Sequence, residues 1–279
     1  MKFRIRKNSA QSAAQSPAPA PDIRLRSWIG LAALGFLLGL IAFMPASLFE
    51  GLANRALAPQ AQVRIGDGSI WAGRGVLSLT AGGGANNIPF SWRFDPPALL
   101  RLRAGVKLDL DSAVLAGKVR VALGIRSIEV RDASLRIDAS LIGAANSMAG
   151  LLGPAGSLLV ETPAGEAVVG SYRGPLLAGG NLKVRAENIL LRTVAARALG
   201  NYDIDVALRD TAAEFRITQA SGPLKLDGGG SIKWSLPHQL SYRGIAGAPA
   251  DAAEVLAPLR LIGRPMADGR VQIDYQGGW

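Results

Sequence analysis

The sequence contains no cysteine and only one histidine, His238, among its 279 residues. Without cysteine the chain has no disulfide bond, no thiolate nucleophile and no thiolate metal ligand, so its folded part must be stabilised by an apolar core. A single histidine that directly follows Pro237 fits a turn residue and cannot build a zinc site by itself. We therefore predict no metal ion and no cofactor.

General bases are also missing beside the candidate nucleophiles, because no histidine lies near any of three serines: Ser78, Ser91 and Ser171. A serine nucleophile needs a base within hydrogen-bond reach. Two aspartate pairs are spaced two residues apart, a spacing that suits either a cation site or the solvated face of a strand. We interpret them as solvated-face residues: Asp109 with Asp111, and Asp203 with Asp205. The sequence thus predicts no catalytic residue and no enzymatic activity.

Long runs of basic residues are absent, although the formal net charge is +10. Half of this excess lies in residues 1–27, which hold six basic residues against Asp22. A nucleic-acid-binding surface would gather its lysines and arginines on one face or element, so we predict no nucleic-acid partner. Residues 8–21 are small, polar and proline-containing, which predicts a disordered linker.

Charge is absent altogether from residues 28–49, which run from Trp28 to Phe49. As a helix this segment would be about 33 Å long, enough to cross a hydrocarbon core of about 30 Å. A buried core helix is one alternative, but core helices of this length carry a polar face. A cleaved signal peptide is another, since Ala56-Leu57-Ala58 resembles a cleavage box. Its apolar core would be shorter, however, and Pro59 disfavours cleavage. We predict an uncleaved transmembrane helix.

Basic residues precede this segment, and positive charge stays on the cytoplasmic side of a span. The sequence therefore predicts a cytoplasmic tail over 1–27, a transmembrane helix over 28–49 and a domain over 50–279 on the other side. In a double-membrane bacterium the span lies in the inner membrane and the domain in the periplasm. Within the span, Gly35 and Gly39 have the Gly-x-x-x-Gly spacing that allows two helices to approach closely.

Alternation of apolar and polar residues dominates the sequence after the span, as in Val106-Lys-Leu-Asp-Leu-Asp111. Strict alternation is typical of antiparallel strands with one buried and one solvated face. We predict a mainly β domain of long twisted antiparallel strands, arranged as a sandwich or an open groove. A few short helices are expected over 96–102, 141–152 and 251–261. The glycine triplets 82–84 and 228–230 are interpreted as loops or hairpin turns.

Trp71 and Trp92 are the aromatic residues expected to stabilise the sheet. On paired strands their rings could pack across the sheet, an arrangement worth about 0.5–1.5 kcal/mol beyond area burial. We predict that Trp71 is buried, so that Trp71→Ala would cost about 3–5 kcal/mol.

Several motifs together resemble the type II secretion system protein N family. A basic N-terminus and one apolar span are followed by Gly68-Ser-Ile-Trp71-Ala-Gly73 and then by Trp92-Arg-Phe-Asp-Pro-Pro-Ala-Leu99-Leu100. Later segments are also similar to the family: residues 199–202, 228–234, 261–265, 268–270 and Gly277. The resemblance covers nearly the whole chain and rests on the order of the motifs, whereas residues 140–195 add little.

The resemblance implies an accessory component of the apparatus that exports folded proteins across the outer membrane. Its partners would be other inner-membrane platform proteins, with the secretin as a further candidate. No catalytic residues come with the family, and the matching motif residues are expected to be structural: Gly68, Trp71, Gly73, Trp92, Leu99 and Leu100.

An alternative function is lipid handling. Repeated amphipathic strands after one span also resemble the AsmA-like β-groove proteins, which expose an apolar trough to acyl chains. A trough would leave apolar faces unfilled by any helix and would retain phospholipid, whereas a closed core would retain none. Both functions can share one fold, so the fold alone does not decide between them.

Overall fold

A computed structural model describes residues 31–37, 39–40, 43–57, 61–81, 84–141, 153–171, 177–192, 197–235, 239–257 and 259–278. The chain divides into two units, Met1–Phe43 and Met44–Trp279. The linker predicted over 8–21, most of the helix predicted over 141–152, and His238 lie outside the described residues.

In the first unit, residues 31–37 and 39–40 are helical, and the Phe43 amide donates a hydrogen bond to the Gly39 carbonyl at 3.0 Å. The large apolar side chains described in this unit are exposed: Leu31, Leu34, Phe36, Leu37, Leu40 and Phe43. The segment 28–49 is therefore described only in part. Among the described residues, no helix combines the length and the apolar character that crossing a bilayer requires.

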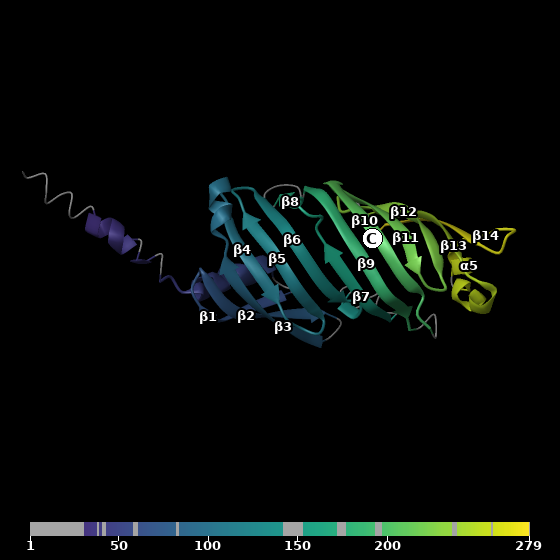
Figure 1. Ribbon diagram of the computed structural model, residues 1–279, viewed down its shortest axis with the longest axis horizontal. Helices are drawn as coiled ribbons and strands as arrows, with labels where there is room; N and C mark the ends of the chain where they lie inside the picture. Colours follow the sequence, from purple (N-terminus) through teal and green to yellow (C-terminus); the bar gives the residue numbers. More distant parts are fainter. Residues whose placement is uncertain are drawn as a thin grey trace, which may run out of the picture. The chain divides into compact units, whose positions relative to one another are not determined.

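The second unit is built around one antiparallel sheet of 15 strands, which twists along its length (Figure 1). Neighbouring strands follow chain order, except that β8 lies in line with β7 between β6 and β9, and β15 lies between β13 and β14. The strands are β1 Ala61–Gly68, β2 Ala72–Ala81, β3 Gly84–Phe94, β4 Ala104–Leu110, β5 Leu115–Leu123, β6 Ser127–Asp138, β7 Pro154–Glu161, β8 Ala167–Ser171, β9 Ala178–Leu191, β10 Gly200–Asp210, β11 Ala212–Ser221, β12 Lys225–Lys233, β13 Gln239–Gly247, β14 Arg264–Pro265 and β15 Val271–Gly278. The mainly β, antiparallel prediction is confirmed.

The two faces of this sheet carry different side chains from the first strand to the last. One cross-strand row holds only apolar residues and glycine: Ile65, Gly75, Phe90, Leu110, Gly117, Leu135, Val160, Val184, Ile204, Ile217, Gly228, Gly244 and Ile273. The adjacent row holds only polar residues and glycine: Arg74, Ser91, Asp109, Lys118, Ser134, Glu161, Lys183, Asp205, Arg216, Gly229, Arg243 and Asp274. Because successive side chains point to opposite sides, the alternation in the sequence becomes an apolar face and a polar face.

Glycines in the sheet make room for rings from neighbouring strands. The triplet 228–230 lies inside β12 and pairs with β11 and β13, so its prediction as a turn is wrong. A Cβ on Gly228 would lie 2.8 Å from the Tyr242 hydroxyl, and one on Gly230 would lie 2.8 Å from the Phe215 ring. These two rings stack with centroids 6.3 Å apart. Gly84 of the other triplet begins β3, and residues 82–83 lie outside the described part.

Short helices lie at the ends of the strands: η1 Ala46–Phe49, α2 Glu50–Leu57, η2 Pro96–Arg101, η3 Ala250–Leu256 and α5 Leu259–Ile262. η2 confirms the helix predicted over 96–102, and η3 with α5 confirm the one over 251–261. Asp251 makes no side-chain cap, and Pro249 occupies the N-cap position of η3. Residues 46–49, assigned to the end of the predicted span, form η1 of the second unit.

The tightest packing lies under η3, where Val255 and Leu256 join apolar residues of the C-terminal part of the chain: Leu199, Leu224, Ala246, Val271 and Ile273. Elsewhere most of the apolar face is half-buried, for example at Val106, Val160 and Val184, although Ile88 on β3 is fully buried. All the described strands belong to one continuous sheet, so the two-sheet sandwich, one of the two arrangements predicted, does not describe this part of the chain.

Candidate functional site

Four of the motif residues, Gly68, Trp71, Gly73 and Trp92, meet at the turn from β1 to β2, and we name them the motif corner. Gly68 pairs with Gly73 across the turn, and Gly73 pairs with Trp92 on β3. Gly68 has a φ of 131°, and a Cβ there would overlap the backbone of Ala72 and Gly73. Only glycine fits such a position, so this motif residue is fixed by the tightness of the turn.

The two tryptophans hold the motif corner together. The indole N–H of Trp92 donates a hydrogen bond to the Ser69 carbonyl at 3.1 Å, and its ring lies where a Cβ on Gly73 would be. The Trp71 ring meets Phe94 edge-on with centroids 4.8 Å apart, and the Trp92 ring lies 5.8 Å from that of Phe90. Both tryptophans are half-buried, so Trp71 is less enclosed than predicted.

The motif corner is also where the chain joins the sheet. The Ile70 amide donates a hydrogen bond to the Met44 carbonyl at 3.1 Å, and Pro45 forms a β-bridge with Ser69. The sequence alone gave no sign of this contact, because it joins residues on either side of two helices.

Leu99 and Leu100, the other two motif residues, lie on η2 and take no part in the core. Their side chains are 54% and 90% exposed, whereas Ala98 on the same helix is buried. Large aliphatic side chains this exposed on a short helix point to a surface that contacts something else.

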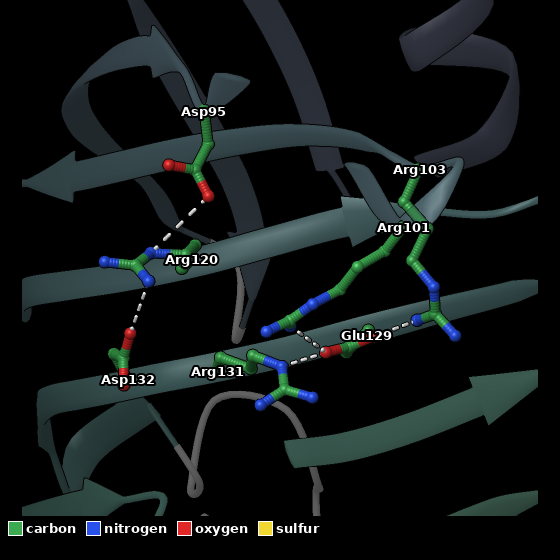
Figure 2. A network of polar contacts seen from close by, with 7 residues as sticks. All are labelled: Asp95, Arg101, Arg103, Arg120, Glu129, Arg131 and Asp132. Carbon is green, nitrogen blue, oxygen red and sulfur yellow. Dashed lines mark hydrogen bonds and ion pairs between the residues drawn. The ribbon is translucent and has the colours of Figure 1, made fainter. Parts of the chain in front are cut away.

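A buried charge cluster lies beside η2 (Figure 2). The Glu129 side chain is 5% exposed; its carboxylate accepts hydrogen bonds from Arg103 and Arg131 and lies 3.7 Å from Arg101. Burial alone would raise the pKa of Glu129, but the hydrogen bond from Arg131 and the attraction of Arg103, Arg131 and Arg101 hold the pKa below its ordinary value of 4.5.

The second half of the charge cluster is centred on Asp95, which immediately precedes η2. Its carboxylate is 3.2 Å from Lys107 and 3.7 Å from Arg120, and Arg120 also pairs with Asp132 at 2.9 Å. The surrounding cations compensate the burial of the Asp95 and Glu129 carboxylates, and these ion pairs fix the position of η2. Sequence reasoning missed the cluster, because Glu129 alternates along its strand like any polar-face residue.

A cavity of about 630 Å³ opens on the apolar face in the C-terminal half. Its walls come from strands β7, β9 to β13 and β15 with η3 and α5, and include Leu158, Ile204, Phe215, Leu226, Tyr242 and Val255. We name this cavity the apolar groove. It is lined by side chains that suit hydrocarbon.

Two tyrosines of the apolar groove, Tyr202 and Tyr242, carry no charge near neutral pH. The Tyr202 hydroxyl lies 2.9 Å from the Leu224 carbonyl and 3.2 Å from the Leu199 carbonyl; burial, together with nearby Tyr242, raises its pKa to about 12. The Tyr242 hydroxyl is buried without a hydrogen-bond partner among the described residues, and burial followed by the charge of Asp227 raises its pKa to about 12.

The two edges of the sheet end differently. At β1, the Asn54 side chain accepts a hydrogen bond from the Val63 amide at 2.6 Å and donates one to its carbonyl at 2.9 Å, and Glu50 accepts one from the Ile65 amide at 3.0 Å. At the other edge, β14 pairs only with Val271 and Gln272 of β15. Residues 273–278 therefore have one strand neighbour in the part of the chain that the structure describes.

The remaining residues considered as sites from the sequence, the aspartate pairs and the Gly35–Gly39 pair, do not form a common site in the described structure. Asp109 lies on the polar face and pairs with Lys118 at 3.7 Å, and Asp203 pairs with Arg185 at 3.0 Å. Within the described residues, no group of three or more histidine, cysteine, aspartate or glutamate side chains is placed to hold a metal ion. Gly35 and Gly39 lie in the helical segment of the first unit, where a Cβ on either would meet nothing within 4 Å.

Fold and surfaces together define a class: a single-sheet β protein with one apolar and one polar face, closed at one edge and open at the other. The family model of the type II secretion system (T2SS), protein N, matches residues 59–274, which include almost all of the sheet. The chain belongs to this family, a structural component of the secretion system, and the resemblance carried by the motifs is confirmed. No curated protein and no solved structure matches the chain.

Proposed function

We propose that the protein is a bitopic inner-membrane accessory component of the type II secretion system, with its N-terminus in the cytoplasm and its sheet in the periplasm. The observation that carries this proposal is the family match over 59–274. The uncharged run from Trp28 to Phe49 and the basic residues before it support the anchor and its orientation. The protein acts by holding partners together and performs no catalysis.

The open edge at β15 provides a physical means of docking. An unpaired strand edge accepts a strand from another protein, because main-chain hydrogen bonds then continue across the interface. Asp274 and Gln276 are exposed at this edge, whereas the β1 edge is already engaged by Asn54 and Glu50. A platform protein, or the secretin, would add a strand beside β15.

Crosslinking in cells tests this docking. A photo-reactive residue at Gln276 should capture a secretion-system protein. The same residue at Gln62, which is equally exposed but lies on the engaged β1 edge, should not. Equal capture at both positions would show that the edge is not selective, and capture at neither would contradict docking through β15.

A second contact is proposed within the membrane, at Gly35 and Gly39. Leucine at both positions would block a close approach of helices, and a Cβ at either position meets no described atom of this chain within 4 Å. The double substitution should abolish crosslinks between this segment and a partner helix. Undiminished crosslinking would remove the glycine pair from the interface.

Lipid handling is the second candidate function, and the apolar groove favours it. The groove lies on a face whose central row is apolar or glycine on every strand that the row crosses, and the described helices near it, η3 and α5, lie beside its C-terminal end. An acyl chain needs no hydrogen-bond partner, so it suits walls of this kind, whereas a peptide strand there would leave its backbone unsatisfied.

Retained lipid decides whether the groove is occupied. Purification of the full chain in mild detergent should yield phospholipid in a fixed ratio to protein, measured by mass spectrometry. Ile204→Lys, which places a charge in the groove, should lower that ratio. Asp205→Lys, on the polar face of the same strand, should leave it unchanged. Protein free of phospholipid would contradict the lipid function and leave the secretion function standing.

A further inference from the structure

A surface of large aliphatic side chains and arginines lies at the ends of β3 to β6. It combines η2 with the turn between β5 and β6, which meet because Ala104, just after η2, pairs with Leu123 at the end of β5. We name the aliphatic members the leucine tip and give their exposed fractions in order: Leu99 54%, Leu100 90%, Leu102 88%, Leu123 49% and Ile125 79%.

The exposed charge beside the leucine tip is positive. Arg101 has a side chain 61% exposed, and Arg126 is exposed in the adjoining turn. The carboxylates of Asp95 and Glu129 beside it are only 5% exposed and are paired with the cations of the charge cluster, among them Arg101. A surface that is apolar at its centre and cationic at its border complements an anionic lipid interface.

The position of the leucine tip within the sheet unit indicates which partner it can contact. The chain enters this unit at Met44, whose carbonyl accepts a hydrogen bond from the Ile70 amide. Trp71, which follows Ile70, packs on Phe94, and η2 begins at Pro96, two residues after Phe94. The leucine tip therefore lies at the same end of the strands as Met44, where the chain enters this unit. Because the proposed function places a membrane span directly before Met44, a membrane is the apolar phase that we expect beside the tip.

We propose that the leucine tip inserts into the periplasmic leaflet of the inner membrane and that Arg101 and Arg126 bind anionic phospholipid headgroups. This inference rests on the proposed function in one respect, the anchoring of the chain in that membrane. Apolar side chains move from water into the acyl region while the arginines stay at headgroup level, as in interfacial segments of peripheral proteins. The insertion would fix the orientation of the sheet on the membrane and hold the far edge, β15, away from it.

The test uses the absence of native cysteine, which allows single labelled positions in the full chain. Leu100→Cys carries an environment-sensitive fluorophore in vesicles of phosphatidylethanolamine and phosphatidylglycerol. Its matched control is Ala113→Cys, an exposed residue in the turn at the other end of β4 and β5. The label at position 100 should be quenched by doxyl-labelled lipid and protected from iodide, and the label at position 113 should show the reverse.

Charge removal separates lipid binding from other contacts. Each basic residue near an anionic surface contributes about 1 kcal/mol, so Arg101→Gln with Arg126→Gln should shift the insertion equilibrium toward water by about 30-fold. Vesicles without phosphatidylglycerol should have the same effect on the unsubstituted chain. If the fraction of inserted label at position 100 stayed the same in the double arginine variant and in vesicles without phosphatidylglycerol, the proposed role of Arg101 and Arg126 would be wrong.

Flotation of the same vesicles distinguishes the failure of this inference from failure of the anchor. If the protein floats with the vesicles after a carbonate wash but the label at position 100 is open to iodide, the tip does not insert and the anchor stands. If the label is shielded from both quenchers, a protein or a second copy covers the tip and the inference is wrong. If the protein does not float, the anchor itself fails.

Discussion

At the motif corner, residue 73 must be glycine because the Trp92 ring leaves no room for a side chain there. Its backbone is ordinary for a strand, but the space where a Cβ would stand is filled by the Trp92 ring, which in turn binds the Ser69 carbonyl. The motif residues Gly73 and Trp92 lie on separate strands, and both are explained by one packing contact between them.

Gly73→Ala should destabilise the sheet unit by about 1–3 kcal/mol, the usual cost of overpacking, because the new methyl group pushes the indole off Ser69. Gly179→Ala is the control, since a Cβ there meets nothing within 4 Å. Thermal unfolding followed by circular dichroism should show a lower midpoint for the first variant only. Equal midpoints for both would mean that the Trp92 contact contributes no stability.

Glu129 makes stability depend on acid pH. Its folded pKa lies below the ordinary 4.5, so the carboxylate stabilises the fold above that pH, and this contribution disappears as pH falls through the folded pKa. Glu129→Gln should lower stability at neutral pH by about 1–3 kcal/mol, typical for lost hydrogen bonds to charged groups. It should also flatten the loss of stability below pH 4.5. Glu214→Gln, at an exposed residue of the polar face, should alter neither quantity in chemical denaturation; an unchanged acid limb in Glu129→Gln would contradict the assignment.

Among the elements, the short helix α2 covers one edge of the sheet. By hydrogen bonding to the backbone of β1 it closes one edge of the sheet. An uncovered strand edge invites pairing with another chain, so α2 directs docking to the opposite edge.

Asn54→Ala should expose the Val63 amide and the outer edge of β1. Hydrogen exchange of the peptide covering 61–68 should accelerate, and light scattering should reveal self-association through the new edge. Arg55→Ala, on the adjacent and exposed residue of α2, should leave both measurements as in the unsubstituted chain. Unchanged exchange in Asn54→Ala would show that α2 does not protect β1.

Elements were predictable where their cause is local. Alternation along a strand is decided by adjacent residues, which is why strands such as Val106 to Leu110 and the helix at Pro96 could be found in advance. The strand position of the triplet 228–230 could not be predicted, because Gly228 and Gly230 leave room for the side chains of Tyr242 and Phe215 on other strands. The bonds from α2 to β1 and the cations around Glu129 likewise depend on residues brought together only by folding.

At the scale of the molecule, the second unit is one sheet with two faces and two distinct edges. The polar face is solvated, the apolar face holds the groove, and the edges separate a closed end near the incoming chain from an open end at β15. Such a sheet suits a scaffold that is anchored at one end and offers a docking edge at the other.

The extracellular proteome of a clean deletion strain, compared with its parent, is the first measurement to make for the secretion function. We expect folded exoproteins to disappear from the medium and accumulate in the periplasm, while the lipid composition of the envelope stays normal. Normal exoprotein levels together with a leaky, lipid-imbalanced envelope would contradict the secretion function and favour the lipid groove.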